Sequence, residues 1–269
     1  MNRRWWLRLA SLAFGFSVTW TAQVQGADAE KPREGGYRIL MVTQSAGFKH
    51  GSVTRKEGKL SPAEQVVTEM GIRSNLFRVD CTQDVKKDFT KDNLKNYDIV
   101  WFYTTGDLPI EKADLEYFFN DWLKQKGHGF IGTHSAADTY HNYQPYWDMI
   151  GGTFNGHPWG SGETVTVTVH DKKHPASKPW GDEFEIKDEI YQFREWARRD
   201  VHVLLRLDAR SVDAARGKRA DGDYALAWTK AYGRGRVVYT ALGHDPEIWA
   251  DARFRSHLAG AIGWALGGP

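Results

Sequence analysis

The 269-residue sequence lacks the features that mark several common protein classes. Cys81 is the only cysteine, so an intrachain disulfide is impossible. There is no HExxH, paired CxxC or Walker motif, so nothing in the sequence indicates the metal and nucleotide sites those motifs form. Acidic and basic residues nearly balance, with a formal net charge of +2 and no long run of one sign. This balance argues against a dedicated nucleic-acid binder.

Residues 1–26 have the pattern of a secretory signal peptide. A basic start is followed by an apolar stretch too short to span a bilayer comfortably, and Val24 and Gly26 place small residues at the −3 and −1 positions of a cleavage site. We expect cleavage after Gly26, a flexible leader over residues 27–36, and a periplasmic or secreted protein. The adjacent Arg3 and Arg4 also resemble a twin-arginine signal, which leaves the export route open. No later segment reaches about 18 consecutive apolar residues, so we expect no membrane span in the mature protein.

From residue 37 onward, short apolar runs alternate with helical patterns. Strands are predicted at 39–42, 74–79, 99–103 and 129–133. A capping box with proline at the first helical position, Ser61 to Glu64, starts a helix that Gly71 is expected to stop. Single helices between strands predict a mostly parallel sheet covered on both faces.

The second half adds strands near 165–169 and 201–207, a hairpin around Gly233 to Gly235, and a final helix over about 254–266. No internal repeat or low-complexity linker occurs, so residues 37–269 are interpreted as one α/β domain.

Four histidines have a sequence context that ordinary surface histidines lack. His50, His134 and His244 follow predicted strands or lie in the loops after them, and His157 lies in a glycine-rich segment before Pro158. Ligands of parallel α/β sheets bind beyond the carboxyl ends of the strands. Any one of these residues alone fits a hydrogen-bonded structural histidine, but the set favours a shared site.

His134 has the most specific setting. Gly132 and Ala136 stand two places on either side of it at a strand-to-helix turn, which is the spacing of a nucleophile elbow. An imidazole at the centre of that turn, exposed by it, could transfer protons near neutral pH or bind a metal. Ser135 is a weaker candidate nucleophile because it lies one residue off the centre.

The segment Asp188-Glu189-Ile190-Tyr191 supplies carboxylates. Neighbouring side chains of a strand point to opposite faces, so we expect at most one carboxylate to enter the site, and Glu189 is the candidate base or metal ligand. A solvated acidic loop is the alternative. Asp138 and Asp245 are placed to orient His134 and His244. A divalent metal held by His134, His157 and Glu189 stays open, because their spacing gives it no independent support.

Five motifs follow one another along the chain: Met41-Val42-Thr43 with Gly47-Phe48-Lys49-His50, Gly132-Thr133-His134-Ser135-Ala136, Gly151-Gly152-Thr153-Phe154 with Gly156-His157-Pro158, Asp188-Glu189-Ile190-Tyr191, and the run from Gly235 to Asp245. Taken together, these motifs resemble the ThuA-like (trehalose utilisation) family over residues 37–266. The resemblance implies the class I glutamine-amidotransferase-like fold, a flavodoxin-like three-layer sandwich with a mostly parallel sheet. It also implies a histidine, here His134, where amidotransferases place their catalytic cysteine, which argues against amidotransferase activity.

The resemblance points to sugars, because the family is tied to trehalose and related disaccharides through 3-keto intermediates. The first expectation is an exported enzyme that hydrolyses, eliminates or isomerises a 3-keto-disaccharide or glycoside by acid–base chemistry. The alternative is a non-catalytic sugar-binding module. The twelve Trp and eleven Tyr fit either sugar stacking or the core. The candidate catalytic residues are His134, Glu189, His50, His157, His244 and Asp245.

Overall fold

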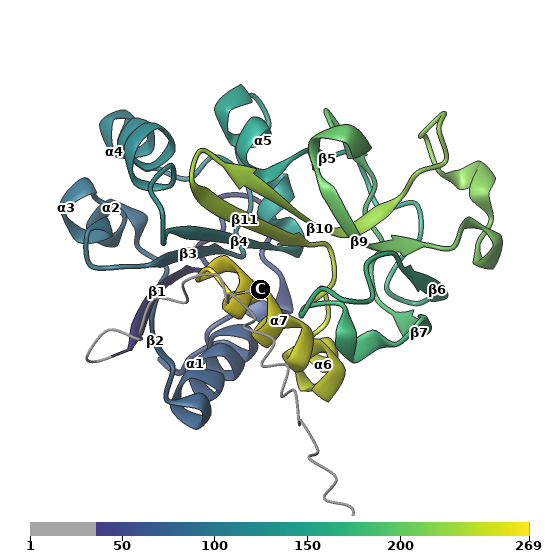
Figure 1. Cartoon of the computed structure of the whole chain (residues 1–269), viewed down its shortest axis with the longest axis horizontal. Helices are drawn as coiled ribbons and strands as arrows, with labels where there is room; N and C mark the ends of the chain where they lie inside the picture. Colours follow the sequence, from purple (N-terminus) through teal and green to yellow (C-terminus); the bar gives the residue numbers. More distant parts are fainter. Residues whose placement is uncertain (1–35, 269) are drawn as a thin grey trace, which may run out of the picture. The chain divides into compact units, whose positions relative to one another are not determined.

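The computed structural model describes residues 36–268, and a nine-stranded sheet runs through it in the order β2-β1-β3-β4-β11-β10-β9-β6-β7 (Figure 1). The first five strands in this order pair in parallel, and the last four extend the same sheet with antiparallel pairs. The parallel strands are β1 (Tyr37–Val42), β2 (Phe77–Thr82), β3 (Ile99–Phe102), β4 (Gly129–Thr133) and β11 (Gly235–Thr240). The antiparallel strands are β6 (Thr164–Val169), β7 (Glu183–Lys187), β9 (His202–Leu207) and β10 (Ala225–Tyr232). The expected parallel sheet of an α/β protein is confirmed.

Helices cover both faces of the parallel half, as Figure 1 shows. One face carries α1 (Pro62–Ser74), α6 (Pro246–Ala250) and α7 (Ala252–Ala265), and α6 contacts both of the others. The opposite face carries α2 (Val85–Asp88), α3 (Lys91–Leu94), α4 (Lys112–Tyr117) and α5 (Gln144–Ile150). Every residue of β3 and β4 is buried, as expected for strands covered on both sides. No helix formed by residues 36–268 is long and apolar enough to cross a membrane.

Short elements complete the chain. β5 (Thr153–Phe154) and β8 (Phe193–Arg194) form a separate antiparallel pair. A π-helical turn, η2 (Phe118–Trp122), continues α4. The 3-10 turns are η1 (Gly51–Val53), η3 (His134–Asp138), η4 (Lys178–Trp180), η5 (Arg198–Asp200), η6 (Ala209–Ser211) and η7 (Ala214–Arg216).

The capping box of α1 forms as predicted, but the helix ends later than predicted. Ser61 accepts a hydrogen bond from the Glu64 backbone N–H, and the Glu64 carboxylate accepts one from the Ser61 N–H. The helix runs past Gly71 to Ser74 and closes at Asn75, whose φ of 54° is left-handed. Asparagine tolerates that conformation, so it serves as the stop. This shift moves the following strand to Phe77–Thr82, three residues beyond its predicted start.

Many tryptophans belong to the core. Among the largest fully buried side chains are Trp101, Trp122, Trp159, Trp228 and Trp249. Where their indole N–H groups are buried, hydrogen bonds satisfy them: Trp228 donates to the Ile150 carbonyl at 2.8 Å. For these residues the core interpretation of the aromatic content holds, and a sugar-stacking residue must be sought at the surface.

The predicted hairpin forms between β10 and β11, around Gly233 with its positive φ of 61°. It brings β11 back beside β4, with Thr240 opposite Thr133. This pairing determines where the site lies, because the loops after both strands leave from the same edge of the sheet.

Candidate active site

The turn after β4 has the backbone of a nucleophile elbow. His134 has a φ of 46°, in the left-handed region that side-chain-bearing residues rarely adopt. A Cβ at Gly132 would lie 3.0 Å from Ile150 Cδ1 and 3.3 Å from Ala136 Cβ, so a larger residue beside the turn would push these neighbours aside. The Tyr239 hydroxyl donates to the His134 carbonyl at 2.7 Å and holds the turn in place. The predicted elbow is confirmed, with histidine at its centre.

The His134 side chain is buried, which corrects the expectation of an exposed imidazole. Its ring packs against Tyr191 with centroids 4.2 Å apart. Its Nδ1 lies 2.6 Å from the Ala241 carbonyl oxygen, which only accepts, so Nδ1–H donates and a neutral ring keeps a lone pair on Nε2. Asp138 does not orient the His134 ring, contrary to the expectation from the sequence. It is bonded to His141 instead, because the backbone beyond β11 already occupies the position beside Nδ1.

His244 is held by its backbone. The buried Asp188 carboxylate accepts hydrogen bonds from the Gly243 N–H at 2.7 Å and the His244 N–H at 3.1 Å. The Tyr103 hydroxyl donates to the Gly243 carbonyl at 2.8 Å. Asp188 therefore supports the loop that presents His244, and Glu189 beside it reaches the reactive groups.

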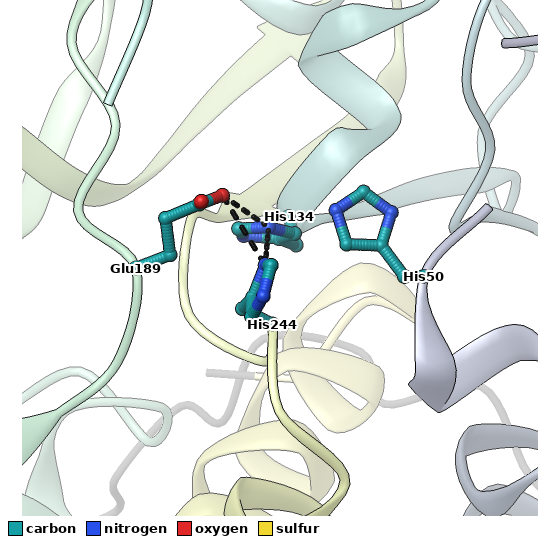
Figure 2. A group of neighbouring side chains, drawn as sticks. All are labelled: His50, His134, Glu189 and His244. Atoms are coloured by element: carbon teal, nitrogen blue, oxygen red, sulfur yellow. Dashed lines mark hydrogen bonds and ion pairs between the residues drawn. The ribbon is translucent and has the colours of Figure 1, made fainter. Parts of the chain in front are cut away.

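Two imidazole nitrogens and one carboxylate oxygen lie next to one another (Figure 2). His134 Nε2 lies 3.1 Å from His244 Nδ1 and 3.4 Å from Glu189 Oε2. His244 Nδ1 lies 3.2 Å from the same Glu189 oxygen. The three atoms thus form a nearly equilateral triangle, which we call the His–His–Glu triangle.

His50 faces this triangle from the side opposite Glu189 in Figure 2. It follows β1, is 3% exposed, and its ring centroid lies 4.9 Å from that of His134 and 5.1 Å from that of His244. Ser52 on the same loop donates to the His244 carbonyl at 2.8 Å. One potential ligand atom from each of the four residues lies within 4.8 Å of the others.

The two remaining candidates lie around this group. His157 Nδ1 is 3.3 Å from the second Glu189 oxygen, Oε1, and its side chain is half exposed. Asp245 Oδ1 is 3.7 Å from His244 Nε2. All six candidate residues therefore lie in one region. Ser135 Oγ is buried without a hydrogen-bond partner in residues 36–268, so no base activates it.

Burial and neighbouring charges act on these groups in opposite directions. Burial raises the pKa of Glu189, but the His134 and His244 imidazoles outweigh it and hold that pKa well below its usual value. Burial lowers the pKa of His244, and Glu189 more than restores it, so the net shift is upward. Burial, with His134 and His244 next, lowers the pKa of His50 to about 3. At neutral pH the site therefore presents a carboxylate beside a neutral His50.

Tyr191 and Phe48 are among the side chains at the site that were not identified as candidates from the sequence. Tyr191 packs against His134, and its sequence context does not distinguish it from any other buried aromatic residue. Phe48 is 67% exposed, and its ring stands edge-on to His50 with centroids 4.8 Å apart. An aromatic residue beside glycine in the loop after a strand was the available signal for Phe48.

Comparisons with known proteins agree with this architecture. The trehalose utilisation (ThuA) family model matches residues 38–265. A ThuA-like protein from Bacteroides uniformis superposes with a TM-score of 0.68 at 23% identity, over 89% of this chain and 95% of that one. A second from Parabacteroides merdae gives 0.62 at 19%, over 86% and 90%.

A protein from Salmonella typhimurium described as cytoplasmic gives a TM-score of 0.58 at 14% identity, over 85% of this chain and 98% of that one. None of the curated proteins matches the sequence. The structural likenesses show a shared fold, and the family match covers nearly all of the described residues. The chain belongs to the trehalose utilisation (ThuA-like) family.

Proposed function

We propose that the protein is an exported carbohydrate-processing enzyme that acts on a keto-sugar, such as a 3-keto-disaccharide or glycoside, by acid–base chemistry. The family name, trehalose utilisation, supports the sugar class. The single observation that carries the proposal is the His–His–Glu triangle, in which a carboxylate and two imidazoles converge beyond the carboxyl ends of β4 and β11.

A keto group makes the neighbouring C–H bond acidic, and removing that proton needs two functions. A base must take the proton, and a positive or hydrogen-bonding group must stabilise the charge that develops on the carbonyl oxygen. Glu189 is placed to act as the base, since its carboxylate is ionised and Oε2 lies 3.4 Å from His134 and 3.2 Å from His244. The two imidazoles hold its pKa low, so its basicity would rise when they bond to the substrate instead. His244, with its raised pKa, fits the donor to the carbonyl oxygen. Proton removal of this kind serves elimination and isomerisation.

The exposed Phe48 ring supports a sugar ligand in particular. It stands beside His50, at the rim of the site, where the apolar face of a pyranose can pack on it. Export rests on residues 1–26, which lie outside the described residues. The same ring also suits the alternative, a sugar-binding module without turnover.

The test is a panel of 3-keto-disaccharides compared with their unoxidised parents, with product detected by chromatography. We expect turnover of the keto-sugars alone, and a loss of about 10²–10⁴-fold in Glu189→Gln. His202→Ala is the matched control, because this exposed histidine on β9 pairs with Asp171 and not with the cluster. Binding without turnover of any keto-sugar, equal in parent and Glu189→Gln, would establish the binding module instead.

A further inference from the structure

We propose that the His–His–Glu triangle is a binding site for a divalent transition-metal ion of the zinc class. His134 Nε2, His244 Nδ1 and Glu189 Oε2 would be the ligand atoms, and the remaining coordination position would face His50. The ion's binding is measured without sugar. Only its catalytic role rests on the proposed function: the ion would polarise the substrate carbonyl in place of His244, and Glu189 would act as the base through its other oxygen, Oε1.

The distances within the triangle match a metal's coordination shell. Ligand atoms about 2.0–2.1 Å from a tetrahedral zinc lie roughly 3.3 Å from one another. The three edges here are 3.1, 3.4 and 3.2 Å, contributed by three segments far apart in the chain. One face of a coordination tetrahedron is therefore already assembled.

Proton counting also favours a cation. His134 uses its Nδ1–H on the Ala241 carbonyl, so its Nε2 offers a lone pair when the ring is neutral. The Glu189 carboxylate only accepts. His244 Nδ1 has at most one proton, which can bridge to one of these two atoms but not to both. A cation at the centre of the triangle satisfies all three atoms at once.

Each ligand has an outer partner that fixes its orientation, as metal sites usually require. His134 is fixed by Ala241, and Glu189 Oε1 contacts His157 Nδ1 at 3.3 Å. His244 has Asp245 3.7 Å beyond its Nε2, while Asp188 binds its backbone N–H. Glu189 is the one carboxylate of this pair among the potential ligands, as expected from the sequence, and its negative charge suits a doubly charged ion.

The donor set identifies the class of ion. Two imidazole nitrogens and one carboxylate oxygen suit zinc and its transition-metal neighbours, whereas magnesium and calcium prefer oxygen ligands. Three protein ligands with a further position free is the pattern of catalytic zinc sites. His50 is 3% exposed and its Nδ1 has no hydrogen-bond partner in residues 36–268. It can approach the ion directly or bond a water bound there.

The experiment uses the untagged chain, stripped with a chelator and dialysed. Zn²⁺ titration by calorimetry should give one ion per chain with a Kd of about 1 μM or tighter. Glu189→Gln and His244→Ala should each weaken binding by at least ~10-fold, and His202→Ala should bind as the parent does. Circular dichroism confirms that each variant is folded. His244→Ala and the near-isosteric Glu189→Gln avoid disturbing the fully buried His134.

Substitution with Co²⁺ gives a second readout. Bound Co²⁺ should show the visible d–d absorption of a four- or five-coordinate site, and Glu189→Gln should lose it. No binding tighter than about 1 mM, or equal affinities in the parent and both ligand variants, would overturn the site. Stoichiometric zinc without sugar turnover would support the metal site and contradict the proposed function. Turnover that survives complete removal of metal would contradict the ion's catalytic role alone.

Discussion

His134 Nε2 lies 3.1 Å from His244 Nδ1, although 110 residues separate the two in the chain. The contact follows from strand pairing. β4 and β11 run parallel with Thr133 opposite Thr240, so His134 and the loop carrying His244 leave the sheet at the same edge. Asp188 then fixes the second loop through its backbone. The site is therefore built by the sheet register and held by one buried carboxylate.

Asp188→Asn should lower both stability and activity. An amide in place of the carboxylate weakens the hydrogen bonds from Gly243 and His244, or turns an N–H donor toward them. We expect a loss of about 1–3 kcal/mol in the free energy of unfolding, measured by urea denaturation. Asp92→Asn is the control, since its exposed pair with Lys95 contributes little. Unchanged stability and activity in Asp188→Asn would contradict the role assigned to this carboxylate.

Phe48→Ala should raise KM for a keto-sugar with little change in kcat. The ring is exposed beside His50, and loss of one aromatic contact of about 1 kcal/mol corresponds to roughly a fivefold change. Ile72→Ala, on α1, removes an apolar side chain of similar exposure, 75% against 67% for Phe48, and serves as the control. Equal kinetics in the parent and Phe48→Ala would exclude sugar stacking at this ring.

Acid should destabilise the fold partly through His257. Burial lowers its pKa to about 4, against about 6.5 in an unfolded chain, and its Nδ1–H donates to the Ala176 carbonyl at 2.7 Å. Protons therefore bind the unfolded chain first. The stability contributed by the neutral ring is complete above pH 6.5 and is lost as pH falls toward 4, by about 3 kcal/mol at most.

His257→Gln tests this pH dependence, because the amide can still donate to Ala176 without titrating. Its free energy of unfolding should fall less steeply than the parent's between pH 6.5 and 4. His174, whose pKa burial also lowers to about 4, contributes to the slope in both proteins and cancels in the comparison. Parallel curves for parent and variant would show that His257 does not titrate in this range.

Export remains a prediction from residues 1–26. Protein recovered from the periplasm or the medium should begin near Ala27, as determined by N-terminal sequencing. Changing both Arg3 and Arg4 to Lys should block export only if the twin-arginine route is used. Soluble cytoplasmic protein that keeps Met1 would contradict the signal-peptide interpretation.

Much of the fold was predictable because local patterns agree with it. The apolar run over 39–42 is buried in β1, the capping box starts α1, and the glycines around 233–235 turn the hairpin. Boundaries were less predictable: the left-handed Asn75 extends α1 beyond Gly71. The place of the antiparallel half in the sheet was not predictable. Long-range pairing joins β10, β9, β6 and β7 to the parallel strands, and the alternation of apolar and polar residues along a strand does not reveal its partner.

The site was predictable as a set of residues but not as a network. Strand-end positions brought His50, His134 and His244 into one group, and Glu189 was the expected carboxylate. The partner of His134 Nδ1 is a backbone carbonyl, which has no sequence signature, so a nearby aspartate was expected in its place. For the same reason Asp188, which binds backbone N–H groups, could not be recognised as the residue that holds His244.

A double-mutant cycle on turnover tests most directly whether His134 and Glu189 form one catalytic unit. His134→Asn suits the left-handed backbone at this position better than alanine, and Glu189→Gln preserves shape. With kcat/KM measured on the best keto-disaccharide, each single variant should lose about 10²–10⁴-fold, and the double variant should be little worse than either. Losses that multiply would show two independent roles. Single variants as active as the parent would contradict the assignment of the active site.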